Sequence, residues 1–227
     1  MRKGYVYVDG KVILKPGAFV HDKAKIQIKG GEPVFVSRGG DKLNAALDYF
    51  HLNVSKKVCL DVGASTGGFT DCLLKRGASK IYAVDNGKGQ LAEVLQKDKR
   101  VISIEETDIK NVTSDWFNEP ITFVTVDISF ISLTKVLEPI SKVLSADAQL
   151  VCLVKPQFEA GKSHLSKRGI VRDPKIRWQT VDKVCTIAQQ IGLNYQGVLP
   201  YPQTLSPKDK NKKNQEFLVY FCRKRDF

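Results

Sequence analysis

The 227-residue sequence has no run of 18 apolar residues, and its first residues lead into no apolar stretch of the kind found in signal peptides. These absences exclude a transmembrane helix and a secretory leader, so we expect a cytoplasmic protein without a membrane partner. It contains only five cysteines, with no C-x-x-C pair, and three scattered histidines. That usage indicates free thiols in a reducing compartment and excludes a disulfide framework and a metal site.

Several familiar site motifs are also missing. There is no G-x-G-x-x-G for a dinucleotide and no Gly-Lys-Ser/Thr for a nucleoside triphosphate. G-x-S-x-G and a Cys–His pairing, which mark nucleophilic hydrolases, are absent as well. Any enzymatic function must therefore use another site.

Positive charge is abundant and unevenly distributed. The formal net charge is +12, from 36 basic and 24 acidic residues. Residues 1–42 and 155–179 each carry an excess of five positive charges and residues 205–227 an excess of four, whereas the rest of the chain is slightly acidic. This segregation favours a polyanionic partner, although solvated lysine-rich loops explain the charge equally well.

The order of predicted elements is that of an α/β fold with a small β-rich start. Asp9-Gly10 between two β-rich runs predicts a hairpin, and residues 41–51 have helical spacing. Apolar strands alternate with helices from there on, which predicts a parallel sheet covered on both faces. The predicted strands are 58–62, 81–84, 101–104, 121–126, 149–154, 195–199 and 216–222, and the predicted helices are 69–76, 90–97, 133–144 and 176–191.

A glycine-rich loop follows the first of these strands. Ligands of open α/β sheets bind at the carboxyl ends of strands, where this loop, residues 61–71, lies. Asp61 at the strand end and Asp85 after the next strand suit a ligand with an amino group and a ribose diol, such as S-adenosylmethionine. Asp108, after the third strand, could accept a hydrogen bond from adenine. The alternative is a purely structural strand-to-helix turn.

Two charged residues end apolar strands beside the same crevice. Asp127 follows residues 121–126, and Lys155 follows residues 149–154 and precedes Pro156, which keeps it extended. Charged side chains are seldom buried without a partner, so a structural ion pair is the alternative to a catalytic role. Lys42 and Glu216 are weaker candidates by themselves.

Five segments together resemble the TlyA family of ribosomal RNA 2′-O-methyltransferases, whose members are often labelled haemolysins. They are Ser37–Leu43, Asp61–Asp71, Asp127–Leu133, Val154–Glu159 and Gly169–Asp173. The resemblance implies a class I S-adenosylmethionine-dependent methyltransferase fold of the FtsJ/RrmJ type in residues 37–227, with a seven-stranded sheet whose last strand is antiparallel. It implies that residues 1–36 are a partial S4-like RNA-binding segment without that domain's two leading helices.

The resemblance also implies the site. Lys42, Asp127, Lys155 and Glu216 match the Lys–Asp–Lys–Glu catalytic tetrad of this fold family. The expected cofactor-binding residues are Asp61, Gly63, Ser65, Thr66, Gly67, Gly68, Phe69, Asp85, Asp108 and Asp127.

We expect Lys155 to deprotonate or orient a ribose 2′-hydroxyl, with Lys42 lowering its pKa, Asp127 positioning it and Glu216 holding Lys42 or the ribose. The partner would be ribosomal RNA or a ribosomal subunit, contacted by basic residues in three segments. These are Arg2, Lys3, Lys15, Arg38, Lys162, Lys167, Arg168, Arg172, Lys208 and Lys212. Three alternatives stay open at this point: a membrane-lytic protein, a non-catalytic RNA-binding protein and a base methyltransferase.

Overall fold

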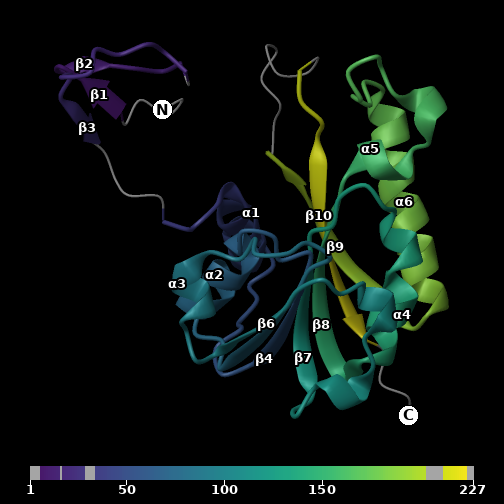
Figure 1. The fold of residues 1–227 in the computed structure, drawn as a ribbon. Helices are drawn as coiled ribbons and strands as arrows, with labels where there is room; N and C mark the ends of the chain where they lie inside the picture. The colour runs from purple at the N-terminus through teal and green to yellow at the C-terminus, as the bar shows by residue number, and fades with distance from the viewer. Residues whose placement is uncertain (1–5, 16, 29–33, 203–211, 224–227) are drawn as a thin grey trace. The chain divides into compact units, whose positions relative to one another are not determined.

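The computed structural model describes residues 6–15, 17–28, 34–202 and 212–223 (Figure 1). The chain divides into two compact units, residues 1–34 and 35–227. The first unit holds an antiparallel sheet in the order β2-β1-β3, formed by Val6–Val8 (β1), Lys11–Val12 (β2) and Ile26–Ile28 (β3). The predicted hairpin is confirmed: β1 pairs with β2 across Asp9 and Gly10, both at positive φ, as a two-residue turn requires.

The second unit is built on a seven-stranded sheet in the order β6-β5-β4-β7-β8-β10-β9. β10 runs antiparallel to both of its neighbours, and the other pairs are parallel, as the family resemblance implies. The strands are Val58–Val62 (β4), Lys80–Val84 (β5), Val101–Ile104 (β6), Ile121–Val126 (β7), Leu144–Val154 (β8), Leu193–Tyr201 (β9) and Glu216–Arg223 (β10).

Helices cover both faces of this sheet (Figure 1). One face carries α1, α2 and α3, and the other carries α4, α5 and α6. Two buried apolar clusters, one under each helical layer, hold the three layers together. The helices are Arg38–Tyr49 (α1), Gly68–Lys75 (α2), Glu93–Gln96 (α3), Leu137–Lys142 (α4), Pro156–Glu159 (α5) and Pro174–Gln190 (α6).

The start of α1 packs very closely against the start of α2. Ser37 caps α1 by accepting a hydrogen bond from the Gly39 backbone N–H, at 3.3 Å. A Cβ on Gly68 would lie 2.9 Å from the backbone nitrogen of Gly40, so only glycine permits this approach. The glycine pairs of the two sequence motifs therefore face each other, and they fix the helix that carries Lys42.

Two predicted helices are shorter in the structure. Of residues 90–97, only Glu93–Gln96 are helical, because the Glu105 carboxylate accepts the backbone N–H groups of Gln90 and Leu91 and holds them in a loop. Residues 133–144 form a 3₁₀ turn at Leu133–Lys135 followed by α4. Pro139 explains the break, since proline is tolerated in the first turn of a helix but not in its interior.

The strands flanking the last helix are longer than predicted. β8 begins at Leu144, which pairs with Ile121 of β7, and β9 extends to Tyr201 because β10 pairs with its whole length. Pro200 fits in β9 because this strand lies at the edge of the sheet, where one side needs no hydrogen-bond donors.

Candidate active site

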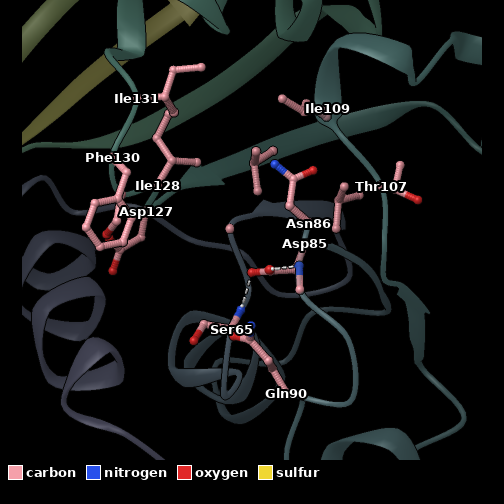
Figure 2. Close-up of a pocket in the computed structure, with 15 residues that line it drawn as sticks. Ser65, Asp85, Asn86, Gln90, Thr107, Ile109, Asp127, Ile128, Phe130 and Ile131 are labelled. Atoms are coloured by element: carbon pink, nitrogen blue, oxygen red, sulfur yellow. Dashed lines mark hydrogen bonds between the residues drawn. The ribbon is translucent and has the colours of Figure 1, made fainter. Parts of the chain in front are cut away.

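A pocket of about 620 Å³ opens at the carboxyl ends of β4, β5 and β7 (Figure 2). The chain reverses direction across the sheet between β6 and β7, and open α/β sheets bind ligands at such a switch point. The volume is typical of a small-molecule site. Polar groups of Ser65, Asp85, Asn86, Gln90 and Thr107 lie across from Asp127 and the loop that follows it, whose Ile128 and Ile131 are apolar.

Asp85 is a pocket residue, as predicted. Its carboxylate accepts the backbone N–H of Ser65 through Oδ2 and that of Gly87 through Oδ1, both at 2.7 Å. These bonds fix the carboxylate at the pocket wall, and each oxygen retains a lone pair that can accept a hydroxyl. The geometry suits a ribose diol.

Asp61 does not reach the pocket, which corrects its predicted role as a direct ligand of the cofactor. Its side chain is fully buried, and its two oxygens accept hydrogen bonds from Thr70 Oγ1 at 2.6 Å and Thr125 Oγ1 at 2.8 Å. Burial raises the Asp61 pKa to about 6, although the two hydroxyl bonds act in the opposite direction. Asp61 thus ties β4, α2 and β7 together beneath the loop.

The glycine-rich loop divides into two parts. Gly63 and Ser65 line the pocket. Gly67, at a φ of +94°, caps α2 below Leu91 and Leu95, and the buried Phe69 contacts α1 beside Gly39. Of the remaining predicted cofactor residues in this loop, Thr66 is exposed and Gly68 forms the helix crossing described above. The sequence motif therefore combines ligand contacts with packing requirements.

Gly63→Ala should weaken cofactor binding at least tenfold. Gly63 has a φ of +80°, and a Cβ would lie 2.5 Å from the backbone oxygen of Asp127, so β4 and β7 would have to separate at the pocket. Titration calorimetry with S-adenosylhomocysteine measures the effect. Gly192→Ala is the matched control, because Gly192 has a φ of +82° with nothing within 4 Å. Equal affinities in the two variants would contradict the close approach as the cause.

Asp108 is also placed differently from the prediction. Its side chain caps a 3₁₀ turn by accepting the Lys110 backbone N–H at 3.0 Å, and it pairs with the Lys110 ammonium at 3.2 Å. These hydrogen bonds lower the Asp108 pKa. Its neighbours Thr107 and Ile109 line the pocket, whereas Asp108 does not. The structure therefore places the neighbours of Asp108, and not Asp108 itself, at the pocket wall.

The four tetrad residues lie at the end of the sheet where β7 and β8 terminate, and they form two ion pairs. Lys155 Nζ is 2.5 Å from Asp127 Oδ1, and Lys42 Nζ is 2.5 Å from Glu216 Oε2. β8 and β10 pair at Val154 and Phe217, which places Glu216 opposite Lys155 by continuation of the register. The positive charge of Lys42 is therefore compensated by the Glu216 carboxylate.

Lys155 is the most enclosed member of the tetrad, with 11% of its side chain exposed. Besides its ion pair, its Nζ donates a hydrogen bond to Ser129 Oγ at 2.8 Å. Asp127 Oδ1 lies beside the same nitrogen as an ion-pair partner but accepts no hydrogen bond from it, so a position on Nζ remains open toward a substrate oxygen. Ser129 also lines the pocket, and its position two residues after Asp127 is the only sequence signal for it.

A further residue, Glu159, is not among the predicted site residues, although it ends the segment Val154–Glu159 that carries Lys155. Its buried carboxylate accepts the Leu133 backbone N–H at 2.7 Å and the Ser132 hydroxyl at 2.5 Å. Through these bonds α5 holds the loop after Asp127, which carries Ser129. Only the fold brings Glu159 and this loop together.

The predicted RNA-binding residues are placed in several regions. Lys167, Arg168, Arg172 and Lys212 line a common groove with Ser166. Lys15, Arg38 and Lys162 are exposed and lie outside this groove. Arg2, Lys3 and Lys208 are outside the described residues.

Within the described parts of the chain, no group of His, Cys, Asp and Glu side chains could hold a metal ion. In the same residues, none of the helices has the length and apolarity needed to cross a bilayer. The five cysteines are free, and burial raises the thiol pKa of Cys59 and Cys72 to about 12.

Comparisons with known proteins agree with this architecture. Hemolysin A of Brachyspira hyodysenteriae is 41% identical and aligns over 96% of this chain and 89% of its own length. The 16S/23S rRNA (cytidine-2′-O)-methyltransferase TlyA of Mycobacterium tuberculosis is 42% identical over 88% of this chain and 75% of its own. A solved structure from Streptococcus thermophilus, provisionally named a hemolysin, has 38% identity and a TM-score of 0.82, and the match covers 98% of this chain and 80% of that one. The model of the FtsJ-like methyltransferases matches residues 35–223, and the chain therefore belongs to that family.

Proposed function

We propose that this protein transfers a methyl group from S-adenosylmethionine to the 2′-hydroxyl of a ribose in ribosomal RNA. The observation that carries the proposal is the arrangement of two ion pairs: Asp127–Lys155, whose aspartate lines the pocket, and Lys42–Glu216, whose glutamate continues the β10 register opposite Lys155. Asp127 belongs to both the pocket and the tetrad, so it joins a cofactor site to an acid–base site. The named activity of the M. tuberculosis relative supports the choice of ribosomal RNA.

The pocket residues fit S-adenosylmethionine. Asp85 would hold the ribose hydroxyls, and Ile109 and Ile128 offer apolar surface for the flat adenine ring. Gly63 and Ser65 bring backbone close to the remainder of the molecule, because glycine leaves no side chain in the way. When bound, the cofactor supplies an electrophilic methyl group.

Lys155 is the residue placed to act on the nucleophile. A ribose hydroxyl is almost wholly protonated at neutral pH, so it needs a group that orients it and receives its proton. Asp127 and Ser129 fix Lys155 Nζ from two directions, which leaves its third position for the 2′-oxygen. In its neutral form the Lys155 amine accepts the hydroxyl proton as the oxygen–methyl bond forms and the sulfur–methyl bond breaks, and the resulting ammonium then returns that proton to solvent. Positioning supplies most of the acceleration, since few rotations remain free.

Lys42 and Glu216 form the second part of the site. Their side chains are each 20% exposed, so the pair faces solvent on the side from which RNA must enter. We assign Glu216 the role of holding Lys42, with its second carboxylate oxygen free to accept a ribose hydroxyl. Lys42 lies in α1 and Glu216 in β10, so this ion pair forms only when two elements that are far apart in sequence pack together.

Methyl transfer from tritiated S-adenosylmethionine to ribosomes, separated subunits and free ribosomal RNA tests the proposal. Digestion to nucleosides should place the label in 2′-O-methylated ribose and not in a base. An RNA with 2′-deoxyribose at the mapped nucleotide should accept no label, because it lacks the hydroxyl. Label recovered in a base would show a base methyltransferase. Label in no RNA would favour the non-catalytic alternative.

A further inference from the structure

The second unit contains a groove lined mainly by positively charged side chains. Its lining consists of Ser166, Lys167, Arg168, Arg172 and Lys212, and its volume is about 580 Å³. The four cationic side chains are exposed and come from two segments 40 residues apart. None of the four has an acidic partner among the described residues. Such a cluster is self-repelling, and a polyanion would relieve that repulsion.

The groove has a fixed frame. Asn214 accepts the Val171 backbone N–H and donates to the Gly169 carbonyl oxygen, both at 2.9 Å. The buried Arg177 donates from Nε to the Val171 carbonyl oxygen at 2.7 Å. Ser166 closes the turn by accepting the Ile170 backbone N–H at 3.1 Å.

The side chains of Asn214, Arg177 and Ser166 make these hydrogen bonds, and Ser166 also lines the groove. Their effect is to fix the backbone on which the cationic side chains of the groove are carried. A preformed site of this kind loses little conformational entropy on binding.

The groove lies close to the tetrad. Its lining residue Lys212 precedes Glu216 by four residues, a chain distance of at most about 14 Å, and Asn214 of its frame precedes Glu216 by two. The turn at residues 166–171 follows α5, which begins directly after Lys155. A strand of RNA with a ribose at Lys155 would therefore pass within reach of the groove.

We infer that this groove binds the phosphodiester backbone of the substrate RNA next to the modified nucleotide. The inference rests on the proposed function for the identity of the nucleic acid. Arginine suits this task because its planar guanidinium can bind two phosphate oxygens at once. Contacts to phosphates carry no information about the base sequence. The groove therefore contributes affinity and the position of the RNA strand, and other residues must select the nucleotide.

The test is the salt dependence of binding to deproteinised ribosomal RNA, measured without any methyl donor. The double variant Lys167→Glu/Arg168→Glu should bind more weakly, and the slope of log K against log salt should become shallower by about 1.4–1.8, the value for two lost phosphate contacts. The charge-matched control Lys56→Glu/Lys99→Glu changes exposed residues that precede β4 and β6, at the opposite edge of the sheet. Its slope should stay close to that of the unmodified protein.

An equal change of slope in both double variants would overturn the inference, because it would show a general charge effect. Unchanged affinity in the groove variant would overturn it as well. S-adenosylhomocysteine affinity should be the same in all three proteins, which excludes misfolding as the cause. Because the measurement requires no methyl transfer, its outcome is independent of whether the protein proves to be a methyltransferase.

Discussion

Lys155→Ala should reduce methyl transfer about 10²- to 10⁴-fold, the usual contribution of a positioned acid–base group. The variant loses the nitrogen that Asp127 and Ser129 hold beside the pocket. It keeps the pocket walls, because Lys155 is not among the residues that line them. Affinity for S-adenosylhomocysteine should therefore remain within a few-fold of that of the unmodified protein.

Single-turnover transfer of tritiated methyl groups and titration calorimetry measure the two quantities separately. Lys142→Ala is the control, since Lys142 forms an exposed ion pair with Glu138 on α4, away from the pocket. Loss of transfer and of cofactor binding together would mean that Lys155 has a structural role. Transfer at the normal rate would remove Lys155 from the mechanism altogether.

Asp61→Asn should remove a loss of about 3 kcal/mol that the unmodified protein shows in its free energy of unfolding as pH rises. The Asp61 pKa is about 6 in the folded protein against 3.8 for an ordinary aspartate. The folded state therefore holds this proton more tightly, and its stability falls as pH rises through the window between those values. Asparagine carries no charge, and it can keep both threonine contacts by accepting from one hydroxyl and donating to the other.

The expected result is that the unfolding free energy of Asp61→Asn, relative to the unmodified protein, increases by about 3 kcal/mol between pH 4 and pH 7. Urea unfolding at a series of pH values measures it. Asp98→Asn provides the comparison, because hydrogen bonds from Arg100 lower the Asp98 pKa to about 2, below this window. Parallel pH profiles for Asp61→Asn and the unmodified protein would contradict the burial of a charge at this position.

The Asp61→Asn variant also tests whether Asp61 supports the loop or binds the cofactor directly. If the carboxylate supports the loop from below, Asp61→Asn should bind S-adenosylhomocysteine nearly normally. A large loss of affinity would restore Asp61 as a direct ligand. The stability and binding measurements on one protein thus separate the two roles.

The sheet was predictable because its strands are buried on both faces and read as short apolar runs between helices. The tetrad positions followed from charged residues at the ends of such runs and from family motifs. The direction of a side chain was not predictable: Asp61 and Asp85 both end strands, yet the first points into the core and the second into the pocket. That difference arises from Thr70 and Thr125, whose hydroxyls attract the buried carboxylate.

Contacts between distant segments were the other part that the sequence could not supply. Glu159 and Leu133, or Asn214 and Val171, are joined by hydrogen bonds that depend on tertiary packing. The sequence around a basic residue in a loop shows no pattern that predicts which other side chains will lie beside it. Charge arithmetic therefore identified the basic segments, whereas the fold selected four side chains and gathered them into a groove.

The position of β10 has a consequence for the order of folding. This strand lies between β8 and β9, so both have an open edge until the last strand of the sheet has been made. During synthesis the nascent chain would expose two unpaired strand edges, a known route to aggregation. Since Glu216 is the first residue of β10, the four tetrad positions come together only when that strand inserts, so the sheet closes and the proposed acid–base site is assembled in the same step.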